Sequence, residues 1–129
     1  MSKIGYKDLV AASEARIRTI SAAEAIDKLD AKDVVFVDLR DVRELKREGG
    51  IPGAFHCPRG LLEFWIDPES PYHHSVFAEP KEFVFFCNLG WRSALAADIA
   101  QQMGLDTCHI EGGFEAWKAL GGATDEQRK

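Results

Sequence analysis

Cysteine, proline and long apolar runs are scarce in this sequence, and each shortage excludes a class of protein. Its 129 residues include five prolines and three cysteines, at positions 57, 87 and 108. This small, odd number of cysteines argues against a disulfide framework and fits a reducing cytosol. No two of them have the spacing of a zinc site. No stretch approaches the roughly 20 apolar residues of a membrane span, and residues 1–10 lack the core of a signal peptide. We therefore expect a cytoplasmic protein with no membrane partner, metal or cofactor.

Positive charge is also in deficit, because 16 lysines and arginines face 21 aspartates and glutamates, for a net charge of −5. This balance disfavours nonspecific binding to nucleic acid. The 46% apolar content is that of a globular chain, and the length fits one domain. We predict a single domain over 1–129, with a core over about 17–120, a helical extension over 1–16 and a frayed tail over 123–129. The oligomeric state is left open.

Apolar runs and polar breaks alternate along the chain in a pattern typical of an α/β domain. Strands are predicted over residues 16–20, 34–37, 54–56, 82–86 and 107–110. Helices are predicted over residues 6–15, after Ser21, after Asp41, over 93–103 and over 114–120. The runs over 34–37 and 83–86 are continuously apolar, which indicates buried strands, whereas residues 16–20 alternate apolar and polar and suit a short strand with one solvated face. This pattern predicts a mainly parallel sheet flanked by helices on both faces.

Cys87 stands where such a fold places its chemistry. It follows the strand over 82–86 and precedes a short loop and a helix predicted to begin at about Ser93. The carboxyl ends of parallel strands and the N-termini of helices both bind anions. Backbone N–H groups around the sulfur would favour the thiolate, Gly90 would let the chain curl, and Arg92 would add a cation at the rim. We predict that Cys87 is a nucleophile.

The alternative to a nucleophile is that Cys87 is a small buried hydrophobic residue at the end of a strand, as isolated cysteines usually are. Cys57 and Cys108 lie in or beside short strands without an anion-binding context, so we expect them in the core. Cys57 could act as a resolving thiol if it lies near the loop. No histidine is tied to Cys87 by local sequence, although His56 could lie near it in space.

Three segments resemble motifs of the rhodanese-like sulfurtransferases, and they come in that family's order. Residues 87–93, CNLGWRS, resemble the active-site loop C-x-x-G-x-R-S. Residues 37–44 and 51–54 resemble the signature D-V-R-x-x-x-E followed by I-P-G-A, and residues 111–117 resemble the C-terminal G-G-x-x-A-W. The resemblance implies a five-stranded parallel sheet. It also implies a substrate-binding loop made of Asn88, Leu89, Gly90, Trp91, Arg92 and Ser93.

The resemblance further implies that Cys87 takes a sulfane sulfur from thiosulfate or a persulfide and passes it to cyanide, a thiol or a protein acceptor. It places Asp38 and Arg40 near the loop, where we expect a bracing ion pair. Two positions depart from the family pattern. Asn88 follows the cysteine where thiosulfate-using members often carry arginine, and Gly50 stands where histidine is common. With an apolar rim around the loop, Asn88 predicts a preference for persulfide donors over thiosulfate.

Two other functions compete with this interpretation. Phosphatases and arsenate reductases also hold an oxyanion in a cysteine loop, with the spacing C-x5-R. Here four residues separate Cys87 from Arg92, and this shorter ring should suit a persulfide better than a phosphate. A noncatalytic binding module is the third possibility. Such modules often lose the cysteine, whereas this chain keeps it together with Arg92.

Overall fold

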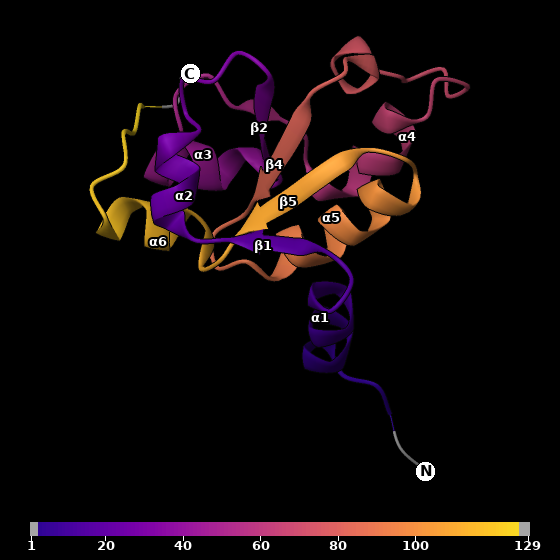
Figure 1. Cartoon of the computed structure of the whole chain (residues 1–129), viewed down its shortest axis with the longest axis horizontal. Coiled ribbons are helices and arrows are strands. Elements are labelled where there is room, and N and C mark those ends of the chain that lie inside the picture. Colours follow the sequence, from indigo (N-terminus) through magenta and orange to yellow (C-terminus); the bar gives the residue numbers. More distant parts are fainter. Residues whose placement is uncertain (1–2, 127–129) are drawn as a thin grey trace.

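The computed structural model describes residues 3–126 and contains a five-stranded sheet whose strand pairs are all parallel (Figure 1). The strands lie in the order β1-β5-β4-β2-β3. Their bounds are β1 Arg18–Ile20, β2 Val34–Asp38, β3 Phe55–His56, β4 Glu82–Phe86 and β5 Asp106–Ile110. The α/β fold and the five-stranded sheet predicted from the sequence are confirmed.

The helices within these residues are α1 Tyr6–Glu14, α2 Ala22–Asp27, α3 Val42–Glu48, α4 Leu62–Ile66, α5 Trp91–Gln102 and α6 Gly113–Ala119. Short 3-10 turns, η1 Arg59–Leu61 and η2 Ser75–Ala78, flank α4 on the way to β4. Ser21 and Asp41 cap α2 and α3, and each forms a capping box with the glutamate three residues later, as the sequence predicts.

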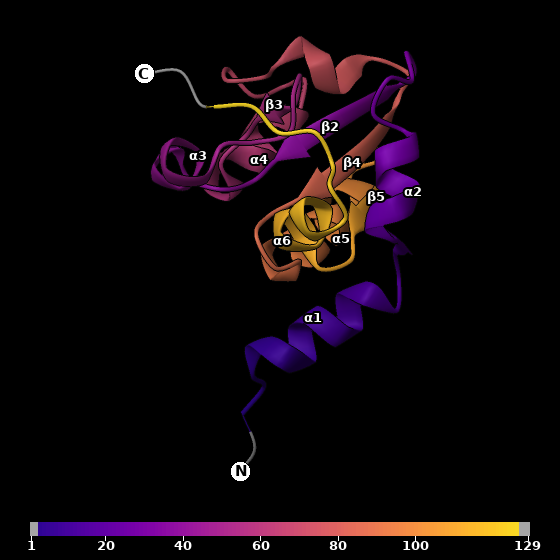
Figure 2. The same cartoon turned by 90° about the vertical axis from the view of Figure 1, so that its left-hand side faces the viewer.

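Strand β4 lies at the centre of the sheet and divides the core in two (Figure 2). Phe83 and Phe85 join one buried cluster with residues of α4 and α5, while Val84 and Phe86 join another with residues of α2 and α6. Successive side chains of a strand point to opposite faces, so a strand covered by helices on both sides must be apolar throughout. The continuous apolar run before Cys87 has this cause.

Helix α5 begins at Trp91, two residues before the predicted start at Ser93. Its N-cap is Gly90, whose φ of +102° is in the left-handed region that glycine adopts most readily. Ser93, expected either to cap this helix or to hydrogen-bond the sulfur of Cys87, lies in the first turn and is fully buried, so it is not the cap. Ala94, Ala96, Ala97 and Ala100 are buried along the helix, and these small side chains let it approach the sheet closely.

Helix α1 projects from the body of the molecule beside α5, in the region predicted to be an N-terminal extension (Figures 1 and 2). One buried aspartate of α5 holds it there: Asp98 accepts hydrogen bonds from Ser13 at 2.9 Å and from Arg16 at 2.6 Å. These bonds, chiefly the one from Arg16, lower the pKa of Asp98 to about 2. The contact is therefore charge-assisted at neutral pH.

The segment after α6 has hydrogen-bond partners in the body of the domain. The indole N–H of Trp117 donates to the carbonyl oxygen of Ala123 at 2.8 Å, and Gly50 and Asp125 exchange backbone hydrogen bonds as an isolated antiparallel bridge. The fraying of residues 123–129 stays a prediction. It includes residues 127–129, which lie outside the described residues.

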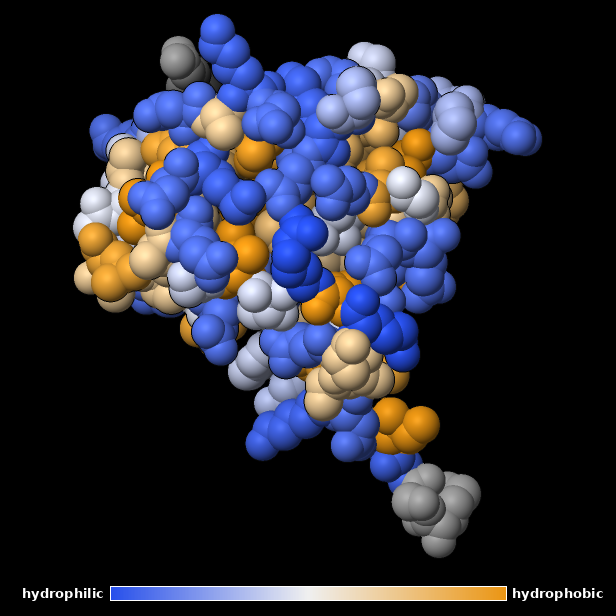
Figure 3. Space-filling model, in the orientation of Figure 1, coloured by the Kyte–Doolittle hydropathy of each residue, from blue (hydrophilic) through white to orange (hydrophobic). Residues whose placement is uncertain are grey.

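The surface is largely hydrophilic on the face seen in Figure 3, with hydrophobic residues in small groups between charged ones. Within residues 3–126, no helix combines the length and the apolar content that crossing a membrane requires.

Candidate active site

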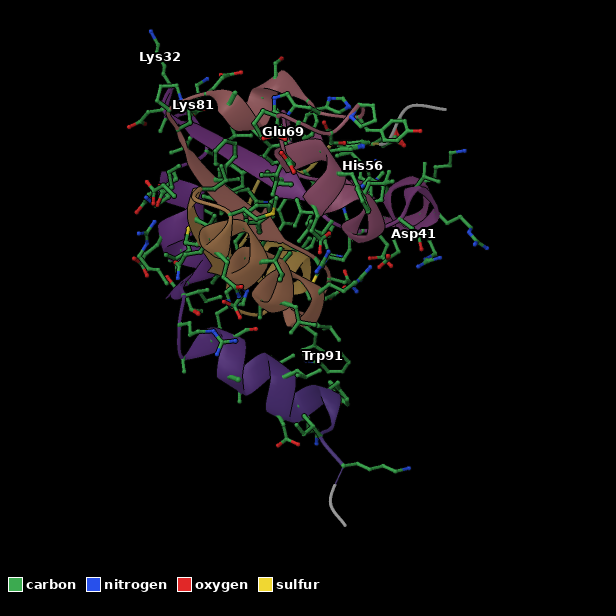
Figure 4. All side chains as sticks on the ribbon, turned by 90° about the vertical axis from the view of Figure 1, so that its right-hand side faces the viewer. Lys32, Asp41, His56, Glu69, Lys81 and Trp91 are labelled. Carbon is green, nitrogen blue, oxygen red and sulfur yellow. The ribbon has the colours of Figure 1, made fainter. Side chains whose placement is uncertain are left out.

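The predicted site residues lie at the carboxyl edge of the sheet. Lys32 and Lys81 precede β2 and β4, and Figure 4 shows them at one end of the molecule. Asp41 follows β2 and His56 ends β3, and both lie toward the other side. Cys87 follows β4 directly, so it belongs to the edge where parallel α/β folds bind their ligands.

The sulfur of Cys87 contacts a backbone amide and a hydroxyl. Its Sγ accepts a hydrogen bond from the N–H of Gly90 at 3.2 Å and lies 3.7 Å from the Oγ of Ser93. Among the described residues, Gly90 is the one whose backbone N–H donates to this sulfur, and the ring of several amides around a charged sulfur stays a prediction. Cys87 is only 1% exposed, so burial by itself does not separate it from a packing cysteine.

The other two cysteines have a different environment. Cys57 and Cys108 are fully buried, and burial raises the pKa of their thiols to about 12 and about 11. Their sulfurs lie 3.8 Å from the carbonyl of Pro58 and a carboxylate oxygen of Glu82, groups that cannot stabilise a thiolate. This placement agrees with core packing and disfavours the thiolate that a resolving Cys57 would need.

Arg92 forms a two-pronged ion pair with Glu44 instead of standing free at the rim. Its Nη1 and Nη2 donate to the two carboxylate oxygens of Glu44 at 2.7 and 2.9 Å. These hydrogen bonds lower the pKa of Glu44 and raise that of Arg92. The cation expected at the loop is therefore largely compensated. Sequence reasoning missed Glu44 as a site residue, although it occupies the glutamate position of the D-V-R-x-x-x-E motif.

Asp38 and Arg40 form a buried ion pair next to β4. Two guanidinium nitrogens of Arg40 donate to the carboxylate of Asp38 at 3.0 and 2.7 Å, and Nη2 also donates to the carbonyl of Gly49 at 2.8 Å. The guanidinium lies over the ring of Phe114, 4.4 Å from its centroid, and 5.9 Å from that of Phe86. The pair thus packs against the residue that precedes Cys87, which fits the bracing role proposed for it.

The start of α6 holds the first two residues of the loop. The N–H groups of Phe114 and Glu115 donate to the carbonyl oxygens of Cys87 and Asn88 at 2.8 and 3.2 Å. Gly113 has a φ of +61°, and a Cβ at this position would collide with the same two carbonyls. The second glycine of the C-terminal motif therefore lets α6 approach the cysteine loop, while a Cβ on the first glycine, Gly112, would collide with Ala116 of α6 itself.

The rim of the loop is apolar and partly covered. Leu89 and Trp91 are each about half exposed, and the ring of Trp91 packs on Tyr6 of α1 at a centroid distance of 4.9 Å (Figure 4). The side-chain oxygen of Asn88 is buried and has no hydrogen-bond partner within residues 3–126. The rim thus offers an incoming ligand apolar contact, while the unpaired oxygen of Asn88 lies beneath the surface.

A histidine does lie near the cysteine, but it is His109 rather than His56. The Nδ1 of His109 lies 3.0 Å from the Oγ of Ser93, and its Nε2 lies 3.5 Å from a carboxylate oxygen of Glu14. The Nε2 of His56 instead contacts the backbone oxygen of Arg40 at 2.6 Å. Sequence reasoning missed His109 and Glu14, because β5 and α1 reach the loop only through the tertiary fold.

A parallel α/β sheet that delivers a cysteine loop to a helix N-terminus defines the class of this domain. The family model described as "Rhodanese-like domain" matches residues 21–120, and the chain belongs to that family. The thiosulfate sulfurtransferase GlpE of Pseudoalteromonas translucida is 31% identical over 78% of this chain and 88% of its own length. The sulfurtransferase candidate YtwF of Bacillus subtilis is 31% identical over 79% of this chain and 91% of its own.

A solved structure from Rhodopseudomonas palustris is similar over nearly the whole chain. It is 51% identical, covers 97% of both chains and superposes with a TM-score of 0.94. That protein is described as having unknown function and as a possible tyrosine phosphatase. The similarity includes the region of α1, which lies outside the residues matched by the family model.

Proposed function

We propose that this domain is a sulfurtransferase in which Cys87 carries a sulfane sulfur as a persulfide. The thiolate attacks the outer sulfur of a donor, the donor's S–S bond breaks, and its inner sulfur leaves as a thiolate. An acceptor thiolate or cyanide then attacks the outer sulfur on Cys87 and restores the cysteine thiolate. Family membership and the sulfurtransferase names of two relatives support this proposal.

The observation that carries the proposal is the hydrogen bond from the Gly90 N–H to the sulfur, at the start of the 12-residue helix α5. The first N–H groups of a helix have no acceptor within the helix, and its dipole favours negative charge there. A second sulfur would extend about 2 Å beyond the first. The sulfur of the resting thiol does not reach the amides of Trp91 and Arg92. We propose that these two amides stabilise the outer sulfur of the persulfide.

The charges at the loop favour a persulfide donor over thiosulfate. Asn88 supplies no charge, and Glu44 already compensates the guanidinium of Arg92. A thiosulfate dianion would therefore meet little positive charge, whereas the apolar rim of Leu89 and Trp91 suits the carbon skeleton of an organic persulfide.

Phosphatase activity is the second candidate, since the Rhodopseudomonas palustris structure is described as a possible tyrosine phosphatase. Phosphate transfer needs a guanidinium aimed at the equatorial oxygens of the phosphate. In this structure both terminal nitrogens of Arg92 bond Glu44, and the loop is one residue shorter than C-x5-R. The ion pair and the short loop both favour sulfur transfer.

Steady-state assays on one preparation discriminate the two functions. We expect thiocyanate formation from cyanide with glutathione persulfide as donor, a lower kcat/KM with thiosulfate, and no hydrolysis of p-nitrophenyl phosphate above background. Cys87→Ala should abolish the thiocyanate signal. Hydrolysis of the aryl phosphate that depends on Cys87, without sulfur transfer, would instead establish the phosphatase.

A further inference from the structure

We propose that Ser93, His109 and Glu14 form a proton relay that receives the proton of the Cys87 thiol. Its last member belongs to α1, outside the residues 21–120 that the family model matches. The inference deepens the proposed function and rests on it, because the relay prepares the thiolate that attacks the sulfur donor. In this relay α1 contributes a positioning residue, Glu14, and it also covers one end of α5.

The contacts define a continuous path from sulfur to carboxylate. The thiol of Cys87 lies 3.7 Å from the hydroxyl oxygen of Ser93, within hydrogen-bonding reach for sulfur. That hydroxyl lies 3.0 Å from the Nδ1 of His109, and the opposite ring nitrogen lies 3.5 Å from Glu14. Ser93 and His109 are 0% and 1% exposed, so protein groups surround both.

The protonation state of the ring sets the direction of the path. Burial lowers the pKa of His109 to about 4, so the ring is neutral at pH 7 and has one N–H and one acceptor nitrogen. With the proton on Nε2, the N–H points to Glu14 and Nδ1 accepts from the Ser93 hydroxyl. The oxygen of Ser93 can then accept from the thiol. Within the described residues, the buried Nε2 of His109 has no hydrogen-bond partner, and the carboxylate oxygen of Glu14 at 3.5 Å lies just beyond hydrogen-bonding distance.

Few charged groups surround the ring of His109. Glu14 from α1 and Cys87 from the loop are the titratable groups that face it along the path. On α5, the two charged residues Arg92 and Asp98 are paired with Glu44 and Arg16. Glu14 is 43% exposed, so it links the buried end of the relay to solvent.

The proton steps balance within the cycle. Cys87 gives its proton to the oxygen of Ser93, the Ser93 hydroxyl gives its own to the Nδ1 of His109, and the ring gives its Nε2 proton to Glu14, which yields a thiolate, a neutral imidazole and a protonated carboxyl at the exposed end. The thiolate takes the outer sulfur of R–S–SH and releases R–S⁻, and the acceptor R′–S⁻ then removes that sulfur as R′–S–SH. The regenerated thiolate recovers its proton from Glu14 by the same path in reverse. The net change is R–SSH plus R′–S⁻ to R–S⁻ plus R′–SSH.

The first test reads the tautomer of His109 directly by two-bond ¹⁵N–¹H correlation spectra of the whole chain. The relay predicts a bare Nδ1 and a protonated Nε2 in the wild type, with this preference weakened in Ser93→Ala. A protonated Nδ1 in the wild type would overturn the relay, since the ring would then donate to Ser93 and could not accept its proton. This readout does not depend on sulfur transfer.

The second test measures the rate at which Cys87 reacts with iodoacetamide and with glutathione persulfide at pH 6 and pH 8. We expect His109→Gln to slow both reactions by about tenfold at pH 6 and less at pH 8, where solvent base can replace the relay. Glu14→Gln should give a smaller loss in the same direction. His74→Gln, whose ring packs on Trp65, is the matched control and should react like the wild type.

The two reagents separate the two proposals. Loss of persulfide formation in the wild type, with alkylation still dependent on His109, would remove the proposed function and leave the relay standing. Unchanged alkylation and persulfide formation at both pH values in His109→Gln, with the fold intact by circular dichroism, would remove the relay alone. Slow reactions at both pH values without a pH difference would identify His109 as a packing residue and also contradict the relay.

Discussion

At the scale of single residues, Cys87 differs from the other two cysteines in what its sulfur touches and not in how deeply it lies. All three are buried, yet Cys87 alone among them receives a hydrogen bond from a backbone N–H. Because an amide donor stabilises the charged form of a thiol, this one contact marks the cysteine suited to nucleophilic chemistry. We propose that the paired Arg92 and the uncharged Asn88 decide which donors the site accepts.

Replacing Asn88 by arginine should convert the donor preference. Asn88→Arg adds a cation beside Cys87 that Glu44 does not compensate, so we expect kcat/KM for thiosulfate to rise about tenfold, equivalent to about 1.4 kcal/mol of added transition-state stabilisation. Asn88→Gln keeps the amide without the charge and is the matched control. Steady-state thiocyanate formation measures both variants. Equal thiosulfate activity in wild type and Asn88→Arg would show that charge at this position does not limit the donor.

At the scale of elements, α6 positions the cysteine loop and α1 covers the beginning of α5. Each depends on a small number of contacts that the sequence does not reveal locally. The first turn of α6 donates to the carbonyls of Cys87 and Asn88, and α1 is held chiefly through Asp98. Both attachments can therefore be tested by single substitutions.

Gly113→Ala should displace the loop from α6. The new Cβ would collide with the carbonyls of Cys87 and Asn88, and a φ of +61° is unfavourable for alanine. We expect a loss of about 2 kcal/mol or more in the free energy of unfolding, measured by urea denaturation, together with a lower kcat. Gly60→Ala is the control, because nothing lies within 4 Å of its Cβ position and its φ is not positive. Equal stability of the two variants would refute this account of Gly113.

Helix α1 should loosen when Asp98 loses its charge. The pKa of Asp98 is depressed to about 2 in the folded protein, below its ordinary value of about 4, so its contribution is present above pH 4 and fades as the pH falls toward 2. Arg16 is 56% exposed, so solvent screening makes the contribution of the ion pair small. Asp98→Asn should therefore speed hydrogen exchange of the α1 amides several-fold at pH 7.

The control for this experiment is Asp27→Asn, which removes an exposed carboxylate from α2 and should leave exchange in α1 unchanged. Lowering the pH from 5 to 2.5 should move the wild type part of the way toward Asp98→Asn after correction for intrinsic exchange rates, because the contribution of Asp98 is lost only in part above its folded pKa of about 2. Protection of α1 that is insensitive both to the substitution and to pH would show that apolar contacts such as Tyr6–Trp91 hold the helix instead.

At the scale of the whole molecule, the sequence predicts the sheet and the position of the cysteine because both follow from local pattern. The apolar run before Cys87 and the capping boxes at Ser21 and Asp41 are read directly from neighbouring residues. The partners of the site are not, since Glu44, His109 and Glu14 come from three separate elements. The compensation of Arg92 by Glu44 likewise depends on how α3 packs beside the loop, which no local spacing encodes.

The most direct test of the account is the intact mass of the protein after exposure to glutathione persulfide and removal of the reagent. The account predicts that the wild type gains the mass of one sulfur atom, that peptide mapping places it on Cys87, and that Cys87→Ala gains none. A wild-type protein that never takes up sulfur, or one whose added sulfur persists in Cys87→Ala, would contradict it.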